Sequence, residues 1–129
     1  MRHQMKYDEQ LRVLFEYTKF HIGLYTGLVT LFLALLALGG NMIPYLLYLW
    51  AKTSVVLIML AGACGGMVAS SIPNHTTYVY YLKEELGWPV AGFIKARAET
   101  WINMEHLFFW ASILVVLVAM ISHVFTIST

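Results

Sequence analysis

Three long apolar runs constrain the fold of this 129-residue chain more than any other feature. Each run holds about 20 or more mostly apolar residues, which is the length that an α-helix needs to cross the hydrocarbon core of a bilayer. We place the three spans at residues 20–38, 44–72 and 102–127. Because backbone groups in lipid must be hydrogen-bonded within the protein, such runs form helices. The sequence therefore predicts an all-α integral membrane protein with three transmembrane helices and short amphipathic interfacial helices.

The composition agrees with a membrane protein. Hydrophobic residues make up 60% of the chain and charged residues 12%, whereas a soluble domain carries about 25% charged residues. The chain therefore lacks the polar surface to cover a globule in water. Its net charge of +1 gives no reason to expect a nucleic-acid partner, since such partners are bound through clusters of positive charge. We expect one membrane domain over residues 1–129, with the lipid bilayer as its first partner.

Glycine and proline mark the ends of the first two spans. Gly39, Gly40 and Asn41 form a helix-ending cluster after the first span. Pro44 is favourable in the first turn of the second span, and Pro73 ends that span. These residues separate the spans without a linker to a second domain.

The segments outside the spans are amphipathic. In residues 1–19, Leu11, Leu14, Phe15 and Thr18 share one helical face, which predicts a helix on the cytoplasmic membrane surface or an extension of the first span.

Residues 76–101 are rich in aromatic residues beside Lys and Glu, as interfacial segments are. Here Thr76 or Thr77 is expected to cap a helix over Tyr78–Leu86, with Gly87 as its stop. Pro89 is expected to begin another helix that leads into the third span.

The basic residues predict the orientation. Seven of the eight Lys and Arg lie before the first span or between the second and third spans. The positive-inside rule then places the N-terminus and the long loop in the cytoplasm and the C-terminus outside, in a bacterial inner (plasma) membrane. The eighth, Lys52, is expected to snorkel to the outer rim of the second span. The alternative is an intramembrane charged pair of Lys52 with His123 on the third span.

Two GxxxG patterns predict close helix packing. Gly23 and Gly27 lie on the first span, and Gly62 and Gly66 on the second. Small residues at this spacing let helix backbones approach closely in a membrane. We expect Gly27 and Gly66 to lie at matched depth in an antiparallel hairpin, glycine face on glycine face. The competing use of these faces is contact between protomers. The single cysteine, Cys64, is expected to be a small apolar packing residue.

Polar residues gather where the three spans meet the cytoplasmic rim. They are Glu16, Lys19, His21, Ser70, Ser71, Asn74, His75, Asn103, Glu105 and His106. The leading interpretation is interhelical hydrogen bonding at a half-wet boundary, which lowers the cost of keeping Glu105 there. One alternative is a metal or proton site built from His21, His75, His106 and Glu105. Another is a pocket for haem, quinone or a lipid headgroup. No HExxH, HxxxH or CxxCH spacing supports a specific cofactor, so none is predicted.

These features favour a non-enzymatic membrane protein that works by association, as a homo-oligomer or as an accessory subunit of a larger membrane complex. The spans show no nucleophile beside a base and no metal motif, so no catalytic residue is predicted. One alternative is an oligomeric pore or small-ion conductor, such as a membrane-permeabilising effector. The other is a haem-, metal-, quinone- or lipid-binding module that uses the His/Glu cluster.

Overall fold

Three long helices dominate the computed structural model of the chain, which describes residues 2–39, 45–75, 77–87 and 95–127. The helices are α1 (Arg2–Gly39), α2 (Tyr45–Ser71) and α4 (Ala98–Ile127). They contain three segments long and apolar enough to cross a membrane: Glu9–Ala37, Leu47–Asn74 and Ala98–Ser122. The helical class and the three candidate spans predicted from the sequence are therefore confirmed.

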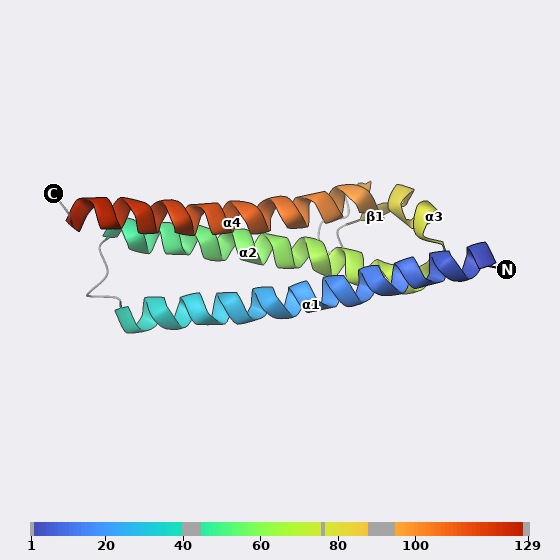
Figure 1. The fold of residues 1–129 in the computed structure, drawn as a ribbon, viewed down its shortest axis with the longest axis horizontal. Coiled ribbons are helices and arrows are strands. Elements are labelled where there is room, and N and C mark those ends of the chain that lie inside the picture. Colours follow the sequence, from blue (N-terminus) through green and yellow to red (C-terminus); the bar gives the residue numbers. More distant parts are fainter. Residues whose placement is uncertain (1, 40–44, 76, 88–94, 128–129) are drawn as a thin grey trace.

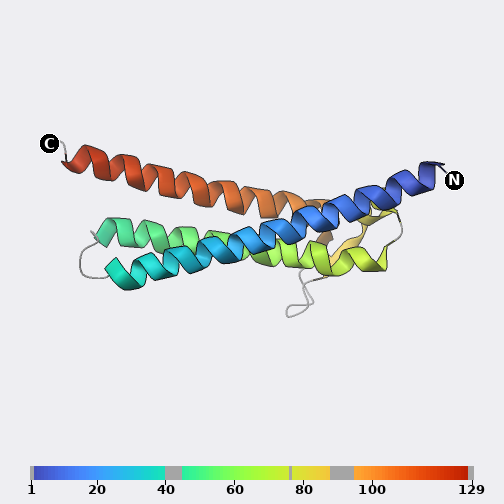
Figure 2. The ribbon, with the colours of Figure 1, turned by 60° about the horizontal axis from the view of Figure 1, so that its bottom comes forward.

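The helix α2 lies between α1 and α4 (Figure 1), and it packs against both of them. Successive long helices run in opposite directions, so the start of α1 and the end of α4 lie at opposite ends of the bundle (Figures 1 and 2). We call the end where α1 begins the N-terminal end.

The amphipathic start of the chain is an extension of the first span. The helix α1 continues unbroken from Arg2 to Gly39, so the alternative of a separate helix on the membrane surface does not hold. Leu11 and Thr18, two of the residues expected on its apolar face, are buried, and the hydroxyl of Thr18 donates to the backbone oxygen of Leu14. This face packs on the N-terminal end of the bundle.

The connection between α2 and α4 differs from the two helices that the sequence predicts. A 3₁₀ turn, Ile72–Asn74, follows α2, and the helix α3 spans only Tyr78–Lys83. Beyond it, β1 (Glu85–Gly87) pairs antiparallel with β2 (Lys95–Arg97). The expected helix over Tyr78–Leu86 is therefore too long by three residues. A helix running on into the third span is interrupted by β2, and the expected start at Pro89 lies outside the described residues.

The strand pair is held in place by the first turns of α4. The buried side chain of Leu86 belongs to the same apolar cluster as Trp101. The indole N–H of Trp101 donates to the backbone oxygen of Leu86. The backbone N–H of Ala98 donates to the backbone oxygen of Glu84. These contacts offset the loss of helical hydrogen bonds after Lys83.

The buried residues form two clusters. The larger lies at the N-terminal end and includes Leu11, Cys64, Val68, Tyr81 and Trp101. The smaller, deeper in the bundle, contains Tyr25, Ile58 and Ala61. The burial of Cys64 fits its expected role as a packing residue.

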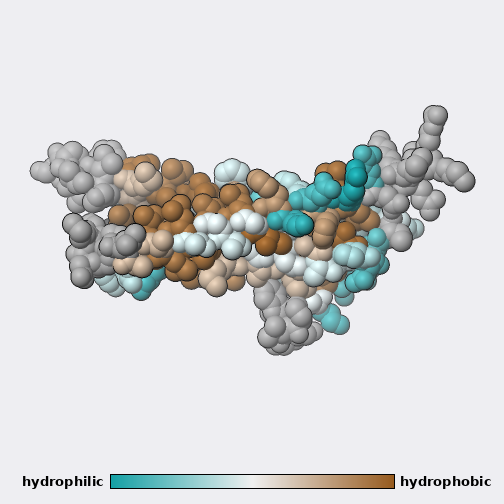
Figure 3. Space-filling model, turned by 90° about the horizontal axis from the view of Figure 1, so that it is seen from below, coloured by the Kyte–Doolittle hydropathy of each residue, from teal (hydrophilic) through white to brown (hydrophobic). Residues whose placement is uncertain are grey.

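The outer surface is largely apolar along the middle of the bundle. Figure 3 shows hydrophobic residues over the central part of one face, with hydrophilic residues concentrated toward the N-terminal end. Large apolar side chains are exposed on all three long helices, among them Leu31, Met59 and Leu114. Such a band is the surface that a membrane-spanning bundle presents to lipid.

Candidate functional site

Glu105 is the most deeply buried acidic side chain that the structure describes, with 1% of its surface exposed. It projects from α4 toward α1, where the Tyr25 hydroxyl donates a hydrogen bond of 2.9 Å to its Oε1 atom. Its second oxygen, Oε2, is also buried and has no hydrogen-bond partner among the described residues. The sequence predicts a half-wet position for Glu105 at the rim. In the structure three helices enclose its side chain instead.

Three residues of α1 line up opposite α4. Tyr17, His21 and Tyr25 follow one another at four-residue spacing, which places them on one helical face. The ring centroids of Tyr17 and His21 are 3.9 Å apart, and those of His21 and Tyr25 are 5.8 Å apart. The ring of Tyr25 also contacts that of Phe109 of α4, at 5.4 Å. Large side chains thus bridge α1 and α4 along this face.

A second interhelical hydrogen bond lies nearer the N-terminal end. The Nδ1 atom of His106 lies 2.7 Å from the backbone oxygen of Ile102. A carbonyl oxygen only accepts hydrogen bonds, so Nδ1 carries a proton and donates it there. In the neutral ring Nε2 is then an acceptor, and the Tyr17 hydroxyl, 3.0 Å away, donates to it. The two adjacent residues of α4 are thus held by different tyrosines of α1.

Glycines of α2 make room for this contact. A Cβ atom on Gly65 would lie 3.3 Å from the Cδ and Oε1 atoms of Glu105, and one on Gly62 would lie 3.7 Å from the Tyr25 ring. Gly65 therefore leaves space that the Glu105 carboxyl occupies. A larger residue is disfavoured there because its side chain would meet the side chains of Glu105 and Ile22.

The glycine-on-glycine packing predicted for the hairpin is wrong. A Cβ atom on Gly23, Gly27 or Gly66 would meet no atom within 4 Å, so these three glycines make no close contact within the described chain. The reason is the rotation of α1, which turns the face of Tyr25 toward the bundle and the face of Gly23 and Gly27 away from it. Contact between protomers through these glycines stays a prediction.

The predicted polar cluster divides into two groups. His21, Glu105 and His106 meet Tyr17 and Tyr25 at the α1–α4 contact, where the His21 and His106 rings are 6.3 Å apart. A cluster of three or more His, Cys, Asp or Glu side chains placed to hold a metal ion does not occur in the part of the chain that the structure describes.

The second group surrounds Tyr81 of α3. The Tyr81 hydroxyl lies 3.0 Å from the Ser71 hydroxyl and donates to the backbone oxygen of Val68, while the His75 ring stacks edge-on at 5.1 Å. Burial raises the pKa of Tyr81, and the hydrogen bond with Ser71 opposes that rise more weakly. The remaining predicted members, Glu16, Lys19, Ser70, Asn74 and Asn103, are exposed.

The structure describes only one side chain of the predicted Lys52–His123 pair. Lys52 is exposed, and its Nζ atom lies 4.2 Å from the centre of the Tyr48 ring one turn earlier in α2. The side chain of His123 lies outside the described residues, so the pairing of Lys52 with His123 stays a prediction.

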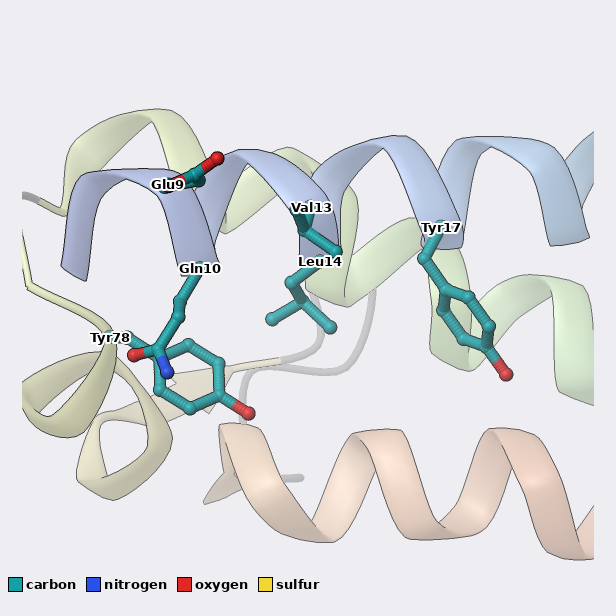
Figure 4. Close-up of a pocket in the computed structure, with 6 residues that line it drawn as sticks. All are labelled: Glu9, Gln10, Val13, Leu14, Tyr17 and Tyr78. Atoms are coloured by element: carbon teal, nitrogen blue, oxygen red, sulfur yellow. The ribbon is translucent and has the colours of Figure 1, made fainter. Parts of the chain in front are cut away.

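An open hollow adjoins the α1–α4 contact at the N-terminal end. It has a volume of about 500 Å³ and is lined by Glu9, Gln10, Val13, Leu14, Tyr17 and Tyr78. Figure 4 shows the Tyr17 ring extending from α1 toward α4 at one end of this space, with Gln10 and Tyr78 at the other. Because the Tyr17 hydroxyl also bonds His106, the hollow ends at the hydrogen-bonded residues between the helices.

The site predicted from the sequence does not include Tyr17, Tyr25 or Gly65. The four-residue spacing of Tyr17, His21 and Tyr25 is a signal that they share a face. The buried pair of Ser54 and Ser112 is not predicted from the sequence either. Their hydroxyl oxygens are 2.6 Å apart between α2 and α4.

Comparison with known proteins identifies no relative: no family model matches the sequence, and neither a curated protein nor a solved structure matches the chain.

Proposed function

We propose that this chain is a small, non-enzymatic integral membrane protein that acts by association. In this proposal the outer face of α1 contacts a helix of another chain, and the first candidate for that chain is a second copy of the protein. An accessory role in a larger membrane complex would use the same face. The N-terminal end faces the cytoplasm of a bacterial inner (plasma) membrane, as the distribution of Lys and Arg suggests.

The observation that carries this proposal is the uncovered glycine face of α1. Gly23 and Gly27 lie on the side of α1 opposite to Tyr25, and both have open space where a side chain would begin. Only 6% of the most apolar window of α1 is buried within the chain, compared with 44% for α2. A second helix packed on this face would approach the α1 backbone closely, where dispersion is the main attraction between helices in lipid.

A second copy is favoured because the face is self-complementary. In a twofold dimer each chain offers the same surface to its partner, and a GxxxG face on one helix fits the same face on the other. Two α1 helices could therefore cross at Gly23 and Gly27 without moving α2 or α4, since a Cβ atom at either glycine meets no atom of those helices within 4 Å.

Disulfide cross-linking in native membranes tests the proposal. In a Cys64→Ala background, Gly27→Cys should form a disulfide-linked dimer under mild oxidation. The matched control is Met59→Cys, at an exposed position on α2, which should remain monomeric. A cross-link to a different chain would show an accessory role, and its mass would distinguish it from the dimer. Equal cross-linking at both positions would show collision without a specific interface, and none at Gly27→Cys would show that lipid covers this face; either result would contradict the proposal.

A further inference from the structure

We propose that Glu105 is a proton-binding site inside the bundle, and that its proton exchanges with water at the N-terminal end through His106 and Tyr17. The ligand is a single proton. This inference concerns the inner face of α1 and is independent of association through the outer face.

The environment of the carboxyl group favours its protonated form. Glu105 has one hydrogen bond, from Tyr25, and its buried Oε2 atom has no partner among the described residues. Burying an ion costs several kcal/mol unless it is paired and fully hydrogen-bonded. Binding a proton removes the charge and most of that cost. The geometry thus favours the carboxylic acid over the carboxylate.

The titratable groups around Glu105 come from all three long helices. From α1 these are Tyr17, His21 and Tyr25, from α2 Cys64, and from α4 His106. The ion pair that the structure describes joins Arg12 to Glu9, and no lysine or arginine of the described residues lies within ion-pair distance of Glu105. The described groups around Glu105 therefore include no permanent positive charge that would hold it ionised.

The proposed route between Glu105 and water begins at the open hollow. The Tyr17 side chain lines this hollow, and its hydroxyl donates to Nε2 of His106, which follows Glu105 in α4. The His21 ring lies close by, with its centroid 6.3 Å from that of His106 and 5.8 Å from that of Tyr25. In the structure Nδ1 of His106 donates to the Ile102 carbonyl and Nε2 accepts from Tyr17, so the transfer requires the ring to turn. A proton from water binds Nε2, the imidazolium turns toward Glu105 and gives that same proton to a carboxylate oxygen, and the neutral ring returns with Nδ1 still protonated. The net change is the transfer of one proton from water to a Glu105 oxygen, with no change in oxidation state, and release follows the reverse order.

Infrared spectroscopy of the full-length protein in an alkyl maltoside detergent, which has no carbonyl group of its own, tests the site. A protonated carboxyl has a carbonyl stretch that a carboxylate lacks. Near neutral pH, where exposed carboxyl groups are ionised, the wild-type protein should show this band. Glu105→Gln should lose it, and Glu99→Gln, at an exposed position on the same helix, should keep it. Absence of the band in the folded wild-type protein, or its persistence in Glu105→Gln, would overturn the proposal.

Two further measurements keep the test decisive if Glu105→Gln does not fold. Tyr25→Phe removes the hydrogen bond to Oε1, so it should shift the frequency of the band and not abolish it. On transfer to D₂O the wild-type band should move as the proton exchanges, and His106→Gln should slow that movement by about tenfold or more, because a positioned imidazole speeds proton transfer. An unshifted band in Tyr25→Phe would contradict the assignment to Glu105. An unchanged exchange rate in His106→Gln would contradict the route.

Discussion

Tyr25 of α1 and Glu105 of α4 are 80 residues apart in the sequence, and the tyrosine hydroxyl donates a hydrogen bond of 2.9 Å to the carboxyl. This bond and the Tyr17–His106 bond join two helices that are not neighbours in the chain. The contact between α1 and α4 thus depends on a few long side chains, whereas α2 packs closely on both helices. Even small changes to these side chains should therefore reduce the stability of the bundle markedly.

Tyr25→Phe should destabilise the bundle. The change removes one hydroxyl and leaves the buried Glu105 carboxyl without its hydrogen bond, which costs about 1–3 kcal/mol. Thermal unfolding in detergent measures the effect, with Tyr80→Phe as the control because Tyr80 is 75% exposed. Equal melting temperatures for the two variants would mean that the Tyr25–Glu105 bond contributes nothing to stability.

Gly65→Ala and Gly66→Ala should differ although the residues are adjacent. Both changes favour the helix by up to about 1 kcal/mol, and a methyl group on Gly66 meets open space. On Gly65 it would press against Glu105, which Tyr25 holds in place. Such overpacking costs about 1–3 kcal/mol. Unfolding temperatures should therefore be lower for Gly65→Ala than for Gly66→Ala, and the reverse order would show that Glu105 moves aside freely.

Stability should fall at high pH because of Tyr81. Burial raises the pKa of its phenol in the folded state, whereas in the unfolded chain it titrates near about 10. The folded state therefore holds this proton more tightly, and the stabilisation is complete below about pH 10 and is lost as the pH rises above it. Unfolding followed across this range should show a steeper loss in the wild type than in Tyr81→Phe. The Tyr80→Phe control should behave as the wild type, and identical curves for all three proteins would contradict the expectation.

The two ends of the chain should lie on opposite sides of the membrane. Three antiparallel long helices require this (Figure 1), and seven of eight Lys and Arg predict a cytoplasmic N-terminus. A C-terminal fusion to a reporter enzyme that works only outside the cytoplasm should be active, and the same reporter at the N-terminus should be silent. The opposite pattern would reverse the orientation and place the Glu105 region near the outer surface.

The sequence predicts the long helices well because their signal is cumulative. About 20 apolar residues in succession, ended by Gly39 or Pro73, leave little choice of structure. The strands Glu85–Gly87 and Lys95–Arg97 are missed because three residues are too few to show an alternating pattern. Their pairing depends on contacts with Trp101 that only the folded chain provides.

The rotation of α1 is the part of the site that the sequence leaves open. Tyr25 and Gly27 both lie on α1 at similar depth, and either face is plausible as the inner one. The choice is made by packing: Gly62 and Gly65 of α2 accept the Tyr25 ring and the Glu105 carboxyl. A pattern of glycines identifies places where backbones can approach, but it does not say whether the neighbour is a helix or a side chain.

Native mass measurement in a mild detergent or lipid nanodiscs tests association through α1 most directly. The wild-type chain of 14.7 kDa should appear as a dimer. Gly27→Leu should appear as a monomer, because the added side chain keeps the α1 backbones apart. Thr53→Leu, at an exposed position on α2, should remain dimeric. A monomeric wild-type protein, or a Gly27→Leu variant with an unchanged mass, would contradict the proposed role of the glycine face.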